Sequence, residues 1–360
     1  MGEPMIQKFQ KLFFLWIILH GAMVQSLDQM IHDQLAADLL HVKKQIKNIQ
    51  LEPITFEVPH DGAAQKFFQR HGFLVRRDGA LGTVLICHGY LGCKRDAIAL
   101  KHLFPHYNVM TFDFRAHGEN RQGQVSTIGR DEAFDVIAAV NFIKSDPLMR
   151  HLPVIAFGYS MGAVSAIQAQ AMDNSLFAAM ILDCPYDSTD DAMRRGLEDK
   201  MKFTIFGRTF SIPGQQFLLD HMYDEYAQMI TNFLFKRITA LDSKSVATKF
   251  VRVSPIESIR AVTVPCYFIH CENDKKVPIH AIERLYENKP GFKRLWITQG
   301  KQHFGSYIYN PELYAYKVMK FLTKLQTQDI NNRVQERILD QRTRKNPSQQ
   351  ECSIIVAKKL

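Results

Sequence analysis

The fold of this chain is decided by the stretch Pro153-Val-Ile-Ala-Phe-Gly-Tyr-Ser-Met-Gly-Ala-Val-Ser-Ala-Ile167. It opens with an apolar run typical of a buried strand and closes with residues that favour a helix. Between them stands Gly158-Tyr-Ser160-Met-Gly162, a Gly-x-Ser-x-Gly sequence in the order strand, turn, helix. Such a turn is strained, and its serine projects beyond the end of the sheet. Glycines flank the serine because side chains at Gly158 and Gly162 would collide with the neighbouring strand and helix. We therefore expect Ser160 to be a nucleophile.

Strands and helices are predicted to alternate on both sides of this turn. Most predicted strands are short, nearly continuous apolar runs, as expected for strands buried on both faces. Alternation of this kind predicts an α/β fold with a mostly parallel central sheet, helices on both faces and an antiparallel start. The expected strands are Ile54–Val58, Gly72–Arg77, Thr83–Cys87, Asn108–Phe112, Pro153–Phe157, Ala178–Asp183, Pro265–Cys271 and Arg294–Thr298, and the expected helices are Lys94–Phe104, Arg130–Lys144, Ser160–Asp173, Ile279–Tyr286 and Pro311–Leu325.

Residues 186–252, called the insertion below, interrupt this alternation. They follow the strand that ends at Asp183, have helical character with no clear strand, and are rich in aromatic side chains. A segment that follows a strand end would lie over the carboxyl edge of the sheet. We expect a helical cap within one hydrolase-sized domain at 51–325, since 360 residues suffice for one large core.

The two ends of the chain differ from this domain. Lys8 and Lys11 precede an apolar run at 12–19 that is too short to span a bilayer and suits a signal peptide, with Val24 and Ser26 at a cleavage site. Residues 1–26 are thus expected to be a signal peptide or an anchor. The protein would then be exported (periplasmic or secreted) or membrane-anchored, with membrane association through this segment. A helix is expected at 27–50, and a charged extension at 326–360.

A serine hydroxyl needs a base within hydrogen-bond reach, and the base needs an orienting acid. His303 lies on a loop after the last predicted strand, and Asp274 lies on a loop after the strand Pro265–Cys271. Both would sit at the same sheet edge as Ser160, so we expect a Ser160, Asp274, His303 triad. Two other carboxylates remain as alternatives for the acid, Glu272 and Asp183.

The oxyanion that forms during acyl transfer needs preplaced N–H donors. The N–H of Met161 stands at the start of a predicted helix. The N–H of Tyr90 lies in the loop His88-Gly-Tyr-Leu-Gly92, where glycines allow a close backbone approach. We expect these two amides to form the oxyanion hole and His88 to be structural.

Other polar groups are expected to be structural. Asp113-Phe-Arg-Ala-His-Gly118 could supply a second acid/base pair from Asp113 and His117, but we favour a turn stabilised by an Asp113–Arg115 pair. No motif for a metal, a phosphate loop or another cofactor is present. The net charge of +9 is scattered and comes with no nucleic-acid motif. The six cysteines do not form a disulfide framework, and Cys266 and Cys271 would face opposite sides of one strand.

Together these motifs resemble the serine-aminopeptidase-like group of the α/β-hydrolases, which includes esterases, lipases and thioesterases. The resemblance rests on His88-Gly89, Asp113-x-Arg-x-His-Gly118, Gly158-x-Ser-x-Gly162, Asp274-x-x-Val-Pro278 and His303, and it covers residues 83–325. It implies hydrolysis of an ester, thioester or amide of a small or lipid-like acyl substrate through an acyl-enzyme, with carboxylesterase or lipase activity favoured. The alternatives are a serine peptidase, an acyltransferase and a non-catalytic binding protein. The loop after His88-Gly89 lacks the extra glycines of the related proline peptidases.

Overall fold

The computed structural model describes residues 50–59, 67–120, 123–200, 202–205, 208–211, 215–229 and 246–327. The chain divides into two units, Met1–Leu51 and Glu52–Leu360, and everything below concerns the second. The leader expected at 1–26, nearly all of the helix expected at 27–50 and the extension beyond residue 327 lie outside the described residues.

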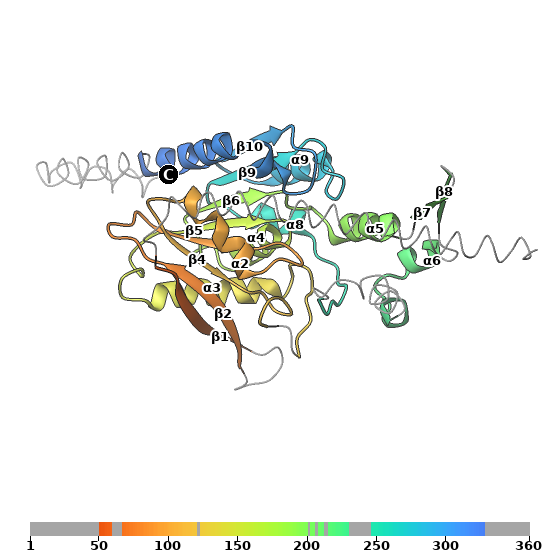
Figure 1. Cartoon of the computed structure of the whole chain (residues 1–360), viewed down its shortest axis with the longest axis horizontal. Helices are drawn as coiled ribbons and strands as arrows, with labels where there is room; N and C mark the ends of the chain where they lie inside the picture. Colours follow the sequence, from red (N-terminus) through yellow and green to blue (C-terminus); the bar gives the residue numbers. More distant parts are fainter. Residues whose placement is uncertain are drawn as a thin grey trace, which may run out of the picture. The chain divides into compact units, whose positions relative to one another are not determined.

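An eight-stranded sheet forms the centre of the second unit, in the order β1-β2-β4-β3-β5-β6-β9-β10 (Figure 1). β1 pairs antiparallel with β2, and β2 pairs antiparallel with β4, whereas the remaining neighbours are parallel. The expected α/β fold with a mostly parallel sheet is therefore confirmed. The strands are β1 (Glu52–Pro59), β2 (Phe67–Val75), β3 (Thr83–Cys87), β4 (Asn108–Phe112), β5 (Val154–Tyr159), β6 (Ala179–Asp183), β9 (Cys266–Cys271) and β10 (Lys293–Thr298).

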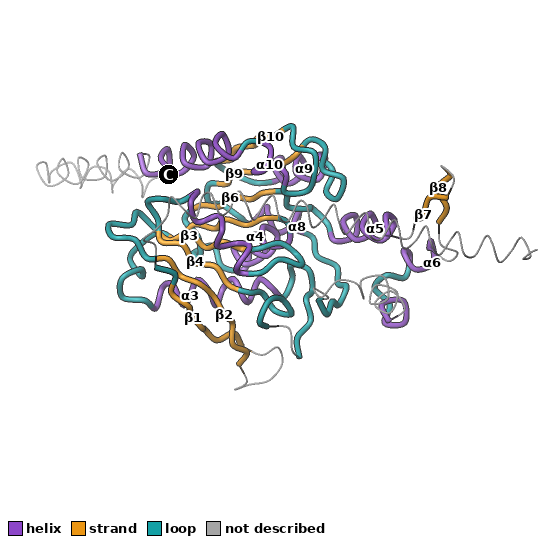
Figure 2. The backbone as a smooth tube through the Cα atoms, in the orientation of Figure 1, coloured by secondary structure: helices purple, strands orange, loops and turns teal. Residues whose placement is uncertain are grey.

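Helices cover both faces of this sheet (Figure 2). They are α2 (Lys94–Ile98), α3 (Glu132–Ser145), α4 (Met161–Met172), α8 (Pro255–Ser258), α9 (Ile279–Asn288), α10 (Gly305–Tyr309) and a helix at 311–327, with 3-10 turns η1 (Ala99–Leu103) and η2 (Ile259–Ala261).

Alternate side chains of the strands account for the two helical layers. On one face Ala156 and Met180 join a buried apolar cluster with Val136 of α3 and Val164 of α4. On the other face Phe157, the next residue of β5, packs edge-on against Phe104, with ring centroids 5.4 Å apart. Successive side chains of a strand point to opposite faces, so both faces need a helical cover. This explains why the central parallel strands are nearly continuous apolar runs.

Two elements differ from the sequence-based expectation. β2 begins at Phe67 rather than Gly72, because Phe67 and Phe68 continue the antiparallel pairing with β1. It ends at Val75, and the N–H of Arg77 donates instead to the side chain of Asn108. The single helix expected at Lys94–Phe104 is α2 followed by the tighter η1 turn, in which the N–H of Phe104 donates to the carbonyl of Lys101.

The insertion contains strands as well as helices. α5 (Thr189–Lys200) and α6 (Gln215–Asp220) are helical, but β7 (Lys202–Ile205) pairs antiparallel with β8 (Arg208–Ser211). The expectation of helices alone was therefore wrong. Each short segment contains a threonine and a phenylalanine, and such β-branched and aromatic residues favour strands. Within the described ranges, no helix combines the length and the apolar character that crossing a membrane requires.

The chain returns from the insertion through residues 246–253, which bind tightly to the main domain. Thr248 forms a parallel bridge with Ser126. The N–H of Ser126 donates to the carbonyl of Ala247, and the N–H of Lys249 donates to the carbonyl of Ser126. The hydroxyl of Tyr90 lies 2.6 Å from Oγ1 of Thr248. The return segment therefore lies beside the loop after β3.

Candidate active site

The carboxyl ends of the parallel strands meet at one edge of the sheet. Loops that leave this edge carry Tyr90 after β3, Ser160 after β5, Cys184 after β6, Asp274 after β9 and His303 after β10. In open α/β sheets this edge is where ligands bind.

Ser160 occupies a sharp turn between β5 and α4. Its φ of 53° lies in the left-handed region, which is a strained conformation for a residue with a side chain. The N–H of Ser160 donates to the carbonyl of Asp183, 2.9 Å away. A Cβ at Gly162 would lie 2.1 Å from the carbonyl oxygen of Cys87, and one at Gly158 would lie 2.6 Å from Cα of Ala163. Both flanking glycines are therefore sterically required.

His303 lies between Ser160 and Asp274. Its Nδ1 is 2.7 Å from Oδ2 of Asp274, and its Nε2 is 2.7 Å from Oγ of Ser160. A carboxylate can only accept, so Nδ1 carries the proton and Nε2 accepts from the serine hydroxyl. This tautomer leaves a lone pair on Nε2 ready to take the serine proton.

Asp274 is buried and held by the backbone. Its Oδ1 accepts hydrogen bonds from the N–H groups of Lys276 (2.8 Å) and Val277 (3.0 Å). Burial by itself raises the pKa of Asp274, but the hydrogen bond from His303 and the backbone donors outweigh it and hold the pKa below its ordinary value. Asp274 is thus ionised at neutral pH and fixes the ring of His303 through Nδ1.

The two rival carboxylates lie elsewhere. Glu272 is exposed on the loop. Asp183 is fully buried at the end of β6, and its Oδ2 accepts a hydrogen bond from the hydroxyl of Tyr314 at 2.7 Å. Burial raises the pKa of Asp183 to about 7. Of the three candidate acids, Asp274 is the one that contacts His303.

The two expected oxyanion donors belong to segments that adjoin Ser160. Met161 is the first residue of α4, where helix N–H groups have no partner within the helix. The loop of Tyr90 passes directly beside Ser160, since a Cβ at Gly89 would lie 3.4 Å from Cβ of Ser160. The ring of Tyr90 packs edge-on against His117, 5.6 Å between centroids.

His88 links two loops behind this site. Its Nδ1 lies 2.8 Å from the carbonyl oxygen of Gly89, and its Nε2 accepts from the N–H of Phe114 at 3.1 Å. Both ring nitrogens are therefore engaged with the backbone. Burial lowers the pKa of His88 to about 4, so the ring stays neutral at ordinary pH.

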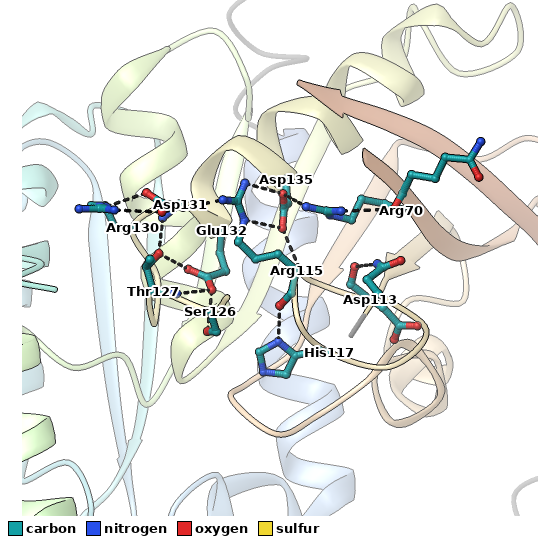
Figure 3. A network of polar contacts seen from close by, with 12 residues as sticks. Arg70, Asp113, Arg115, His117, Ser126, Thr127, Arg130, Asp131, Glu132 and Asp135 are labelled. Carbon is teal, nitrogen blue, oxygen red and sulfur yellow. Dashed lines mark hydrogen bonds and ion pairs between the residues drawn. The ribbon is translucent and has the colours of Figure 1, made fainter. Parts of the chain in front are cut away.

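The expected Asp113–Arg115 pair is wrong. Arg115 binds Asp135 instead, with its Nη2 3.0 Å from Oδ1, and Arg70 binds the same oxygen at 2.9 Å (Figure 3). Asp113 is occupied by Lys94, which supplies both its N–H at 2.7 Å and its ammonium at 3.2 Å. Asp113 and Arg115 do not pair because each has a buried partner from a different helix, α2 for Asp113 and α3 for Arg115.

Glu132 anchors the loop that precedes α3 (Figure 3). Its Oε1 accepts from the hydroxyl of Ser126 and the N–H of Thr127, and its Oε2 accepts from the hydroxyl of Thr127 and the N–H of Gly129. The hydroxyl of Ser126 also lies 3.7 Å from Sδ of Met161. This buried network therefore touches the first residue of α4.

Two further residues adjoin His303 and were not foreseen. Phe304 has a left-handed φ of 58°, and its ring stacks on that of Tyr159, 4.3 Å between centroids. Sγ of Cys184 lies 3.9 Å from Nε2 of His303, and Cys184 has a φ of 43°. The position of Cys184 directly after β6 was the sequence signal that could have revealed it.

Cys184, Asp274 and His303 offer one group of atoms with the spacing of metal ligands. Among the described residues, a sulfur, a carboxylate oxygen and a ring nitrogen of these three lie within 4.8 Å of one another. The side chain of His303 is 16% exposed, so the group adjoins solvent on one side.

Residues 84–315 match the alpha/beta hydrolase family. The chain is also 28% identical over 281 residues to the uncharacterized protein YqkD of Bacillus subtilis (strain 168), an alignment that covers 77% of this chain and 81% of that protein.

Solved structures with the same fold include two named hydrolases. The esterase Pf2001 of Pyrococcus furiosus aligns with a TM-score of 0.56 and 20% identity, over 78% of this chain and 95% of that one. The peroxisomal alpha-beta-hydrolase Lpx1 of Saccharomyces cerevisiae aligns with a TM-score of 0.52 and 14% identity, over 82% of this chain and 98% of that one. At these identities the likeness concerns the fold.

Proposed function

Because this chain belongs to the alpha/beta hydrolase family, we propose that it is a serine hydrolase that cleaves carboxylic esters through an acyl-enzyme. The observation that carries the proposal is the pair of 2.7 Å contacts that join Ser160 to His303 and His303 to Asp274. A nucleophile, a base and an orienting acid in this order are the parts that acyl transfer to water needs.

The first half of the reaction forms the acyl-enzyme. Oγ of Ser160 attacks the acyl carbonyl while Nε2 of His303 takes the serine proton. The carboxylate of Asp274 stabilises the imidazolium that results. His303 then gives the proton to the alcohol oxygen as the bond to the leaving group breaks.

The second half restores the serine. A water molecule loses a proton to Nε2 of His303 and attacks the acyl-enzyme carbonyl, and the acid product leaves as Ser160 regains its proton. In both halves negative charge develops on the carbonyl oxygen, where the N–H groups of Met161 and Tyr90 serve as donors. Loss of one such donor typically costs about 10²–10³-fold in kcat.

Two observations favour an ester with an apolar acyl group. One structural neighbour is named an esterase, although it shares the fold at low identity. The insertion carries exposed apolar side chains in its described part, namely Phe217, Tyr226 and Met229. The insertion leaves the sheet edge that carries Ser160, so exposed apolar side chains in it suit a lipid-like acyl substrate.

The test combines labelling with a substrate panel. A fluorophosphonate probe should label the wild type at Ser160 and leave Ser160→Ala unlabelled. A chain-length series of p-nitrophenyl esters should show a preference beyond acetate, with thioesters and aminoacyl amides tested beside it. Full ester hydrolysis by Ser160→Ala would overturn the proposal. Absence of both labelling and turnover would favour a binding protein, and transfer to an added alcohol in place of water would favour an acyltransferase.

A further inference from the structure

The thiol of Cys184, on the loop after β6, lies close to His303, on the loop after β10. Sγ of Cys184 lies 3.9 Å from Nε2 of His303. Oγ of Ser160 lies 2.7 Å from the same nitrogen. Catalysis as proposed above uses the nitrogen and the hydroxyl, and it assigns no step to the sulfur.

The spacing of the sulfur and the nitrogen suits a tetrahedral zinc ion. Zinc binds thiolate at about 2.3 Å and imidazole at about 2.0–2.1 Å, which puts the two ligand atoms about 3.5 Å apart at the tetrahedral angle. The observed 3.9 Å separation therefore needs a movement of only a few tenths of an ångström. Oγ of Ser160 and a water molecule from the exposed side of His303, or two water molecules, would complete the four ligands.

The surroundings of this pair favour a cation. Asp274 already binds Nδ1 of His303, and a carboxylate in that place fixes the ring and raises the basicity of a metal-bound histidine. The carboxylate of Asp274 also belongs to the group of atoms that lie within 4.8 Å of one another, and its negative charge attracts a divalent metal ion.

We propose that Cys184 and His303 form a zinc site that reversibly blocks the hydrolase. Binding forms a Zn–S and a Zn–N bond, releases the thiol proton of Cys184 to solvent, and replaces the hydrogen bond between Nε2 and Ser160. His303 then has no lone pair with which to take the serine proton. The inhibition rests on the proposed function, whereas the metal binding does not.

The inhibition is tested with the full chain and the metal alone. Zinc chloride should lower the rate of p-nitrophenyl ester hydrolysis, and EDTA should restore it. Magnesium should have no effect, because hard cations prefer oxygen ligands. Inhibition by magnesium equal to that by zinc would overturn the proposal, as would a full rate in zinc.

Variants assign the effect to the sulfur. Each variant is compared with its own rate without zinc. Loss of an outer-shell partner typically costs about 10–100-fold in metal affinity, so loss of the sulfur in Cys184→Ala should raise the half-inhibitory zinc concentration by at least that much. Cys93→Ser is the matched control, since Cys93 lies on a different loop and binds Asp96; it should keep the zinc response of the wild type. Equal zinc responses in Cys184→Ala and the wild type would contradict the site.

A direct binding measurement separates this proposal from the proposed function. This measurement does not depend on catalysis, so it can use the Ser160→Ala variant. Cobalt(II) added to Ser160→Ala should give a sulfur-to-metal charge-transfer absorption that Cys184→Ala and His303→Ala lack. If this absorption depends on both residues but no ester is hydrolysed, the site stands and the proposed function fails. If the esterase is active and the absorption is absent or independent of Cys184, the site is wrong.

Discussion

The hydroxyl of Tyr90 lies 2.6 Å from Oγ1 of Thr248, which joins the loop after β3 to the segment that returns from the insertion. Thr248 bridges to Ser126, and the hydroxyl of Ser126 lies 3.7 Å from Sδ of Met161. Residues 246–249 therefore connect to both residues proposed to supply oxyanion donors. We therefore expect the return segment to fix the positions of Tyr90 and Met161 relative to each other.

Tyr90→Phe tests this connection. The substitution removes one hydroxyl and keeps the ring on His117. A hydrogen bond is worth about 1 kcal/mol net, which corresponds to about fivefold in rate if it acts in the transition state. We expect kcat to fall by about that factor with KM little changed, and the affinity for a trifluoromethyl ketone transition-state analogue to fall in parallel. A change in KM alone would argue for substrate contact instead.

Thr248→Val supplies the matching half of a double-mutant cycle. Both single variants remove this hydrogen bond, and Thr248→Val also removes the bond from the threonine hydroxyl to the carbonyl of Val246. The double variant should therefore lose no more activity than Thr248→Val alone. Additive losses would show that the two hydroxyls act separately.

Asp274→Asn should abolish most activity even though its shape is conserved. Oδ1 of Asp274 accepts two backbone N–H groups, so the amide oxygen must take that place and the amide nitrogen must face His303. Nδ1 would then have to accept, which moves the ring proton to Nε2 and removes the base. Such a loss in a Ser-His-Asp triad is about 10⁴-fold in kcat. Glu272→Gln, at an exposed site, is the control and should keep near-normal kcat.

Asp183→Asn should change how stability depends on pH. Burial raises the pKa of Asp183 from 3.8 to about 7, so in this range the folded chain holds a proton that the unfolded chain has lost. The contribution of Asp183 to stability is full below the unfolded value and is lost as pH rises through about 7. In urea unfolding, the free energy of unfolding should fall more between pH 5 and pH 8 for the wild type than for Asp183→Asn. Equal declines would mean that Asp183 does not carry this proton.

Glu132→Gln should destabilise the fold despite its similar size. Both carboxylate oxygens accept a backbone N–H, one from Thr127 and one from Gly129. In either orientation of the glutamine, its amide nitrogen faces one of these N–H groups, which then has no acceptor. A buried donor without an acceptor costs about 1–3 kcal/mol. Denaturant unfolding measures the loss, and Glu283→Gln on the exposed face of α9 should stay near the wild type.

The sheet was predictable because its signal is local. Residues 154–157 and 179–182 are apolar at every position, a pattern typical of strands covered on both faces. The loop positions of Ser160, Asp274 and His303 follow from the strand ends before them, since parallel strands end at one edge.

The partners of buried charges were not predictable in the same way. Arg115 is two residues from Asp113, yet it binds Asp135, and Lys94 takes Asp113. Which pair forms depends on where α2 and α3 pack, and sequence separation contains no information on that. The contact of Cys184 with His303 likewise joins residues far apart in the chain.

The two ends of the insertion are bound to each other. The N–H of Thr189 donates to the carbonyl of Val253, and the N–H of Val253 donates to the hydroxyl of Thr189. A segment whose ends are already joined can change length cheaply, since each doubling of a flexible loop costs only about 0.6 kcal/mol in closure entropy. Evolution can therefore lengthen, shorten or exchange this piece of chain while the sheet edge that carries Ser160 and His303 stays intact. On the proposed function, substrate choice and bond cleavage could then diverge at independent rates among relatives of this protein.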